Sequence, residues 1–142
     1  MDEVDERLIE MLTYNAQQRS EEMANKLNIS ASSVRRRVNR LISKNIIRIV
    51  AVPIPGEIGL PLRAVIAFDV MHDKLNSVLE ILGKRPEVRW LSATSGRYDI
   101  IAIVWFPSTD QLFNFIESEV GKIEGVKNVE TFICLQKVVS FY

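Results

Sequence analysis

Apolar residues recur at helical spacing along the first part of the chain. Asp2 is a residue type that caps helix N-termini, and apolar positions follow it every three or four residues, so the pattern predicts a first helix. Ser20 is predicted to cap a second helix and Ser30 a third, with a short turn at Asn28-Ile29 between these two helices. Two short helices joined by a tight turn are typical of a helix-turn-helix unit.

A β-branched run follows the third predicted helix directly. The apolar stripe of that helix consists of Val34, Val38, Leu41 and Ile42. The run Ile46–Val52 then predicts the strand of a small wing packed against the helices. The pattern therefore predicts a winged helix-turn-helix domain over residues 1–52.

Proline and glycine concentrate in the next segment, residues 53–61. Five of them interrupt regular structure there: Pro53, Pro55, Gly56, Gly59 and Pro61. We therefore expect this segment to be a linker between two domains.

The rest of the chain, residues 62–142, switches between strand and helix patterns. In order, we expect a strand over Leu62–Val70, a helix over Leu75–Leu82, strands over Val88–Thr94 and Tyr98–Phe106, a helix over Leu112–Val120 that Ser108 caps, and a strand over Val126–Val139. The order β-α-β-β-α-β is that of a ferredoxin-like unit, in which two helices cover one face of four antiparallel strands. The predicted fold class is α+β, with an N-terminal winged helix-turn-helix domain and a C-terminal ferredoxin-like βαββαβ domain.

Both faces of the predicted sheet carry apolar side chains. Ile66 and Phe68 alternate with Val65 and Ala67, and Ile101 and Ile103 alternate with Ala102 and Val104. The two helices cover only one face, so the other would leave an apolar patch in water. We therefore expect this face to be buried in a homodimer.

Composition excludes several classes of protein. With 47% hydrophobic and 25% charged residues, the chain is globular and not disordered. Its one cysteine, Cys134, excludes an intramolecular disulfide, and one Cys with one His excludes a zinc site of Cys/His type. Cys134, on a predicted apolar strand, is expected to be buried. Because the chain has no long apolar run and no signal peptide, we expect it in the cytoplasm. We also expect no metal site and no catalytic residues.

A net charge of zero hides a local excess of basic residues. The chain has 18 Lys+Arg and 18 Asp+Glu, yet residues 30–50 contain no acidic residue. Their basic residues are Arg35, Arg36, Arg37, Arg40, Lys44 and Arg48. Such a concentration indicates that this segment binds a polyanion, although a solvated helix face is the plainer interpretation.

The third helix carries the chemistry expected for DNA recognition. At about 100° per residue, Ser32, Arg36 and Arg40 lie opposite the apolar stripe. Arginine binds guanine or phosphate through paired hydrogen bonds, and serines in the first turn can donate to either. Arg37 lies nearest the core edge, where it either forms an ion pair with the first helices or contacts DNA. The residues predicted to contact DNA are Ser30, Ser32, Ser33, Arg35, Arg36, Arg40, Lys44 and Arg48.

These features together resemble the Lrp/AsnC family of transcription regulators. The resemblance is carried by residues Ser20–Leu27, by Ser30–Leu41 and Asn45–Arg48, by the turn Gly96-Arg97-Tyr98-Asp99, and by Gly125–Ile133. It implies double-stranded DNA as partner, a homodimer that often assembles into an octamer, and a small amino-acid effector bound between subunits, without a cofactor.

The resemblance also points to an effector turn. The residues it implies are Thr94, Ser95, Gly96, Arg97, Tyr98 and Asp99. Backbone N–H groups of a glycine turn can bind a carboxylate, and Asp99 can accept from an ammonium group. The plainer interpretation is that Gly96 permits a tight turn which Tyr98 and Asp99 complete.

Two departures from the family pattern and two other function classes remain open. Asn45 stands where glycine is usual, but asparagine tolerates the same left-handed conformation at a helix end. Arg97 adds a charge beside the turn, so the identity of the effector cannot be carried over. One alternative is an amino-acid-sensing coregulator without its own operator. The other resembles siroheme decarboxylases, which the single His72 in a predicted loop fits poorly.

Overall fold

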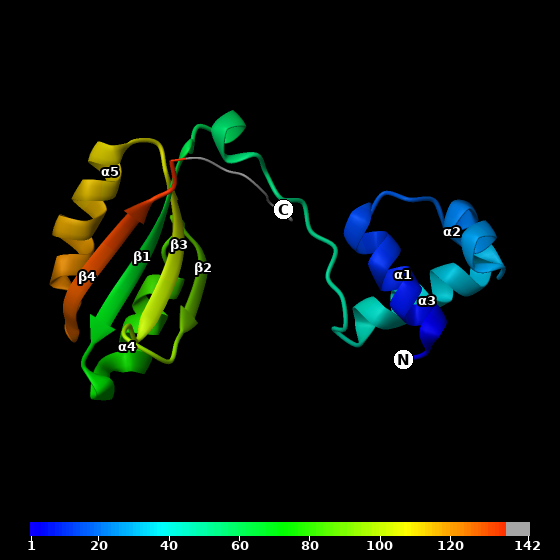
Figure 1. The fold of residues 1–142 in the computed structure, drawn as a ribbon, viewed down its shortest axis with the longest axis horizontal. Coiled ribbons are helices and arrows are strands. Elements are labelled where there is room, and N and C mark those ends of the chain that lie inside the picture. The colour runs from blue at the N-terminus through cyan, green and yellow to red at the C-terminus, as the bar shows by residue number, and fades with distance from the viewer. Residues whose placement is uncertain (136–142) are drawn as a thin grey trace. The chain divides into compact units, whose positions relative to one another are not determined.

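The computed structural model describes residues 1–135 (Figure 1). The chain forms two compact units, Met1–Ala51 and a second that begins at Val52. The first unit contains the helices α1 (Glu3–Tyr14), α2 (Ser20–Leu27) and α3 (Ala31–Ser43).

Capping residues set where these helices begin. The Asp2 and Asp5 side chains each accept the other's backbone N–H, at 2.9 and 3.2 Å, which completes a capping box at the start of α1. Ser30 Oγ accepts the Ser33 N–H at 3.1 Å and caps α3. Both caps confirm the predictions. The prediction for Ser20 is wrong by one position, because Arg19 precedes α2 and provides no side-chain cap.

The helix-turn-helix geometry follows from one left-handed residue and a small core. Asn28 ends α2 with φ +52°, a conformation that asparagine tolerates, and turns the chain into α3. Leu8 and Val34 are fully buried in a cluster with Met23 and Ala24. The predicted stripe of α3 stops short, because Ile42 is exposed.

The predicted wing strand over Ile46–Val52 is absent from the described chain. The backbone N–H of Ile46 bonds to the Leu41 carbonyl at 2.9 Å and Asn45 has φ +54°, which closes the end of α3. Ile49 and Val50 are then exposed in irregular backbone. A β-branched run becomes a strand only where a neighbouring strand accepts its hydrogen bonds, and this unit offers none within residues 1–135.

The predicted linker contains one short ordered turn. Residues Pro55–Ile58 form a 3-10 turn, and Gly59 ends it with φ +77°. Proline fixes the backbone at the start of such a turn, which is why regular structure is not fully interrupted here.

The second unit is the predicted ferredoxin-like fold. Its elements are β1 (Leu62–Val70), a 3-10 turn (His72–Lys74), α4 (Leu75–Gly83), β2 (Val88–Ala93), β3 (Ile100–Phe106), α5 (Thr109–Asn114) with its continuation (Phe115–Lys122), and β4 (Val126–Ile133). The strands are antiparallel in the order β2-β3-β1-β4. Ser108 caps α5 as predicted, through the Gln111 N–H. The last strand, β4, ends at Ile133, whereas the predicted strand ran to Val139. Residues 136–139 of that prediction lie outside the described chain.

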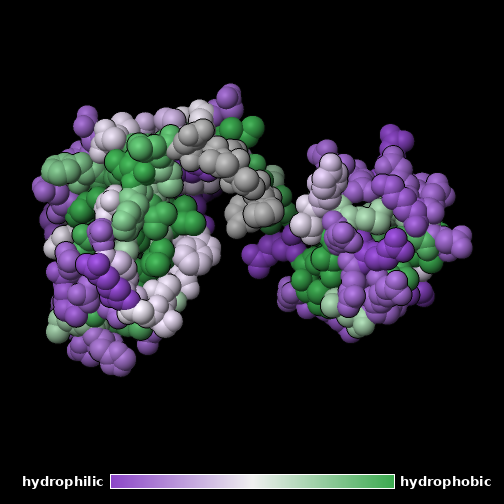
Figure 2. All heavy atoms as spheres, in the orientation of Figure 1, coloured by the Kyte–Doolittle hydropathy of each residue, from purple (hydrophilic) through white to green (hydrophobic). Residues whose placement is uncertain are grey.

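The two helices lie against one face of this sheet (Figure 1), and its buried core is there. Ile66 and Phe68 of β1 point into that core and have no accessible surface. Alternate residues point to the other side, where Figure 2 shows hydrophobic residues across the strands. We call this side the open sheet face and define it by Val65, Ala67, Trp90, Ile101, Ile103 and Phe132. Apolar side chains on both faces were predicted, and the structure confirms them.

Gly125, just before β4, is required by a close approach to the start of α4. Its φ is +102°, and a Cβ there would overlap the Cβ of Lys74 and lie 2.8 Å from its Cγ. We expect Gly125→Ala to lower the free energy of unfolding by about 2–4 kcal/mol, from backbone strain and overpacking together. Urea unfolding measures this.

Gly96→Ala is the matched control for that substitution. Gly96 has φ +113°, but nothing lies within 4 Å of the position of a Cβ. Backbone strain is therefore the only cost of this substitution, and we expect it to lower the free energy of unfolding by about 1 kcal/mol. Equal losses for the two variants would show that the contact with Lys74 is relieved without strain.

Candidate nucleic-acid interface

The exposed start of α3 brings three serines together. Ser30 Oγ accepts the Ser33 N–H and lies 3.0 Å from Ser32 Oγ. Helix N-termini also leave backbone N–H groups unpaired and carry positive partial charge. This end of α3 can therefore donate hydrogen bonds to a phosphate or a base edge.

The structure divides the basic segment into two groups. Arg35, Arg37 and Arg40 form ion pairs with acidic residues of α1, α2 and the Asp2 cap. Arg36, Lys44 and Arg48 are exposed and pair with no carboxylate of residues 1–135. The second group provides the uncompensated positive charge on and after α3.

Arg37 takes the structural role that the sequence left open. Its Nη1 donates to Asp2 Oδ2 at 2.7 Å and to Asp5 Oδ1 at 2.8 Å. Its side chain is 22% exposed, so most of it is covered by α1 and α3. Arg37 therefore joins α3 to the start of α1.

Two predicted DNA contacts are also engaged within the protein. Arg35 pairs with Glu21 of α2 at 3.2 Å, and both side chains are exposed. Arg40 Nη2 donates to Asp5 Oδ2 at 2.5 Å, while its side chain stays 45% exposed. Asp5 itself is 1% exposed and was missed at the level of sequence, because an acidic residue in a first helical turn is explained by capping alone.

These contacts keep the cluster ionised. The hydrogen bond from the Asp5 backbone, followed by that from Arg37, lowers the pKa of Asp2. Burial acts to raise the pKa of Asp5, but hydrogen bonds and charge from Arg37, Asp2 and Arg40 outweigh it, so this pKa is also lowered. The Asp2 and Asp5 carboxylates in turn raise the pKa of Arg37.

The lowered pKa values predict that the first unit loses stability in acid. A carboxyl whose pKa is lower in the folded state stabilises the fold above its unfolded pKa, which is 3.8 for Asp2, and this contribution is lost as the pH falls through the folded pKa. We expect Asp2→Asn to melt below the wild type at about pH 7, and the difference to shrink as the pH falls below 3.8. Melting followed by circular dichroism tests this, and a difference independent of pH would contradict it.

The predicted effector turn connects β2 to β3 and is closed by hydrogen bonds of Thr94. Its N–H donates to the Asp99 carbonyl at 2.9 Å and its Oγ1 to the Tyr98 carbonyl at 2.7 Å. Gly96 has φ +113°, as a tight turn requires, and the Arg97 guanidinium lies 5.2 Å from the centre of the Tyr98 ring. Ser95, Gly96 and Arg97 are exposed.

Asp99 ties this turn to β1. Its Oδ2 accepts the Val70 N–H at 2.8 Å, and its own N–H donates to the Phe68 carbonyl at 2.9 Å. One carboxylate oxygen therefore has a structural role, as the plainer interpretation of the turn predicted. The role of Asp99 as an acceptor for an ammonium group stays a prediction.

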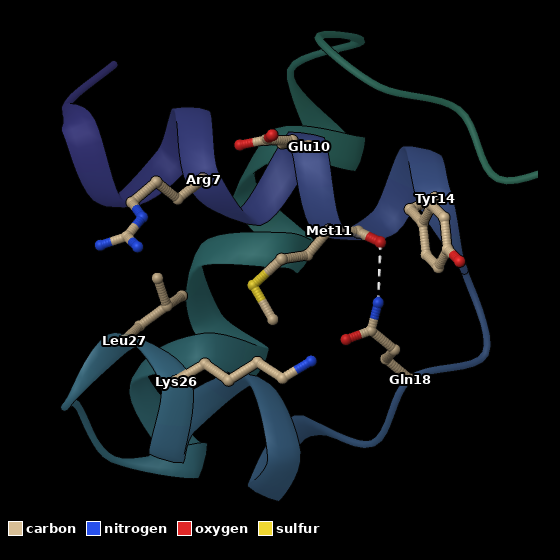
Figure 3. Close-up of a pocket in the computed structure, with 7 residues that line it drawn as sticks. All are labelled: Arg7, Glu10, Met11, Tyr14, Gln18, Lys26 and Leu27. Carbon is tan, nitrogen blue, oxygen red and sulfur yellow. Dashed lines mark hydrogen bonds between the residues drawn. The ribbon is translucent and has the colours of Figure 1, made fainter.

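A hollow of about 390 Å³ lies between α1 and α2 (Figure 3). Gln18 closes one end, where its Nε2 donates to the Met11 carbonyl at 2.8 Å and satisfies a carbonyl near the end of α1. Arg7 and Glu10 come from α1, and Lys26 comes from α2. None of the predicted site residues lines this hollow.

The described chain carries few features of other function classes. In residues 1–135, no group of three His, Cys, Asp or Glu side chains is placed to hold a metal ion. None of the helices in that range has the length and apolar content needed to cross a bilayer. His72 lies in a turn after β1, as predicted. Cys134 is exposed, so its predicted burial is wrong, because β4 ends one residue before it.

Two family models match the two units of the chain. The model of the AsnC-type helix-turn-helix domain matches residues 1–42, and that of the Lrp/AsnC ligand binding domain matches residues 63–142. The HTH-type transcriptional regulator LrpA of Pyrococcus horikoshii is 35% identical over 139 residues, which are 97% of this chain and 99% of LrpA.

Solved structures agree with these matches. AsnC of Escherichia coli has a TM-score of 0.88 and 25% identity, over 99% of this chain and 95% of that one. The transcriptional regulator NMB0573 of Neisseria meningitidis, solved as a complex with L-Met, has a TM-score of 0.91 and 21% identity, over 99% and 93%. The second likeness concerns the fold alone.

Proposed function

The chain belongs to the Lrp/AsnC family and is a helix-turn-helix transcriptional regulator, and on this premise we propose that α3 enters the major groove of its operator. The observation that carries the proposal is the group of exposed cations on and after α3, Arg36, Lys44 and Arg48, which pair with no carboxylate of residues 1–135. Recognition helices of this class present their N-terminal residues to base edges.

Each predicted contact has a part in this proposal. Arg36 reads a base or grips a phosphate by two hydrogen bonds. The serines at the start of α3 and the cations Lys44 and Arg48 bind the DNA backbone. Arg35 and Arg40 add contacts through the N–H groups that Glu21 and Asp5 leave free.

We propose that the two units of the chain have different roles. Residues 1–52 bind DNA, residues 53–61 link the units, and residues 62–142 form the effector-binding and oligomerisation domain. The effector is an amino acid that contacts the turn Thr94–Asp99 between subunits. The match to a ligand-binding domain supports this, as does the turn's rigid attachment to β1.

The open sheet face supports a homodimer, and we propose from the family resemblance that such dimers assemble into octamers. Trp90 and Phe132 are about half exposed there, and Ile103 and Val65 lie between them in the same row across the sheet. Burying apolar area of this kind is the main driving force of association. An effector between subunits then changes the spacing of the DNA-binding units, provided that it binds two assemblies with different affinity.

Fluorescence anisotropy tests the proposed function. The full chain is titrated onto a labelled duplex from the region upstream of its own gene, over a salt series and with or without a mixture of amino acids. We expect tight binding. The logarithm of the association constant should fall linearly with the logarithm of the salt concentration, with a slope of about −0.9 for each phosphate contact. A folded, oligomeric protein without binding to this duplex would refute an operator in the region upstream of its own gene.

We propose no catalytic activity, and we place the regulator in the cytoplasm with its DNA. A decarboxylase acting on a tetrapyrrole needs His and Arg residues around that ligand, and His72 stands in a short turn beside Asp73 and Lys74. A Soret band shift on adding a tetrapyrrole would contradict this.

A further inference from the structure

A buried carboxylate lies beneath the recognition helix. Asp5 is 1% exposed, and among residues 1–135 it is the one polar or charged residue in the buried class. It sits in the first turn of α1, and its two oxygens accept from different arginines of α3: Oδ1 from Arg37 and Oδ2 from Arg40. The two arginines are three positions apart, so they project from the same side of α3.

Packing alone does not account for this carboxylate. Leu8 and Val34, both without accessible surface, already join α1 to α3 in the core of the unit. Removing a charge from water is costly, and a well-packed apolar side chain often stabilises such a contact equally well. What a carboxylate adds is direction, because it accepts hydrogen bonds only from donors placed at its oxygens.

The two arginines differ in what they leave for a ligand. Arg37 is 22% exposed, is shared between Asp2 and Asp5, and its Nε is buried without a partner in the described chain. Arg40 is 45% exposed and gives one nitrogen, Nη2, to Asp5. A guanidinium has five N–H donors, so Arg40 keeps donors that face solvent on α3.

We infer that Asp5 is a positioning residue for DNA recognition, since its carboxylate holds the Arg40 guanidinium ready for the phosphate backbone; this rests on the proposed function. A free arginine side chain loses conformational entropy when it binds a ligand. Because Asp5 already restricts the rotamers of Arg40 in the free protein, this cost on binding DNA is smaller. Arg37 donates to the other oxygen, Oδ1, and the Asp2 backbone N–H also donates to Oδ2, so three hydrogen bonds hold the Asp5 carboxylate in place. The lowered pKa of Asp5 keeps that carboxylate charged at neutral pH.

The sign of a charge change separates positioning from simple electrostatics. Asp5→Asn and Glu21→Gln each remove one negative charge from a partner of an α3 arginine. If net charge alone mattered, both variants would bind polyanionic DNA more tightly. If Asp5 positions Arg40, Glu21→Gln should bind DNA as tightly as the wild type or more tightly. Asp5→Asn should bind about three- to tenfold more weakly per DNA-binding unit, although it has lost a negative charge that repels DNA.

The decisive measurement is a double-mutant cycle by anisotropy with the full chain and the labelled upstream duplex. We expect Arg40→Ala to weaken binding and to lower the salt slope by about 0.9 per DNA-binding unit. With Arg40 absent, Asp5→Asn should change affinity by less than about twofold, because the two residues act as one. Additive losses, or an Asp5→Asn variant that binds as tightly as Glu21→Gln, would overturn the inference.

Circular dichroism at the assay temperature guards against a folding artefact. If Asp5→Asn is unfolded there, the salt slope of Arg40→Ala decides, because a merely structural arginine lowers the melting temperature and leaves the slope unchanged. An unchanged slope overturns the inference. A wild type that binds no DNA refutes the proposed function first, which distinguishes the two failures.

Discussion

Arg36→Ala should weaken binding to the specific duplex by about ten- to 100-fold, the largest effect that we expect from one side chain of α3. Arg36 is exposed near the middle of α3 and has no ion-pair partner among residues 1–135, so its whole guanidinium is available. A bidentate contact to a base is lost outright when the side chain is truncated. Anisotropy with specific and unrelated duplexes measures the loss.

Arg7→Ala is the matched control for this variant. Arg7 is an exposed arginine of the same unit, but it comes from α1 and lines the hollow between α1 and α2 (Figure 3). Both substitutions change the net charge equally, so long-range attraction falls equally. We expect a loss below about threefold for Arg7→Ala. Equal losses for the two variants would mean that Arg36 acts through its charge alone, and a fall in the salt slope would assign it to a phosphate.

Ile103→Glu should convert the protein to monomers and abolish tight DNA binding. Ile103 lies in the open sheet face, paired in register with Val65 and Trp90, and is 37% exposed in the single chain. A carboxylate buried there without a partner should raise the dimer dissociation constant by about 100-fold or more. A dimer binds two half-sites at once, so its affinity for DNA exceeds that of one DNA-binding unit. Separated monomers should therefore bind the operator about 100-fold or more weakly. Sedimentation velocity and anisotropy measure the two effects.

Ile81→Glu provides an equivalent change on the other side of the sheet. Ile81 lies on α4 and is 38% exposed, close to the value for Ile103. It is outside the open sheet face, so we expect the dimer to persist. A monomeric wild type, or an Ile103→Glu variant that stays dimeric, would refute dimerisation through this face.

The sequence located features that depend on neighbours along the chain. Asp2, Ser30 and Ser108 were predicted as helix caps, and each bonds a backbone N–H three residues on. The bounds of β1 and the order of strands and helices followed from apolar periodicity, since each element shows its buried face within its own residues. The exposed position of Arg36 follows from the same helical geometry.

Other predictions failed because the deciding partner is distant in the sequence. The run Ile46–Val52 has the side chains of a strand, yet no strand of the described chain pairs with it. The sequence counted six basic residues in residues 30–50 and left the partner of Arg37 open, but it did not predict that acidic residues of α1 and α2 and the Asp2 cap pair with three of the six. The structural role of Asp99 was one of two interpretations of the turn, but its partner, the Val70 amide 29 positions earlier, was not predicted.

What the sequence determined by itself was the family of folds and the basic segment that we propose binds DNA. Both are properties of local pattern, because periodicity, capping and clustered charge need no knowledge of the rest of the chain. Only the tertiary structure decided which arginines of α3 remain free and that a buried Asp5 holds two of them. Packing α1 against α3 brings Asp5 within reach of Arg37 and Arg40, and their ion pairs span more than 30 positions.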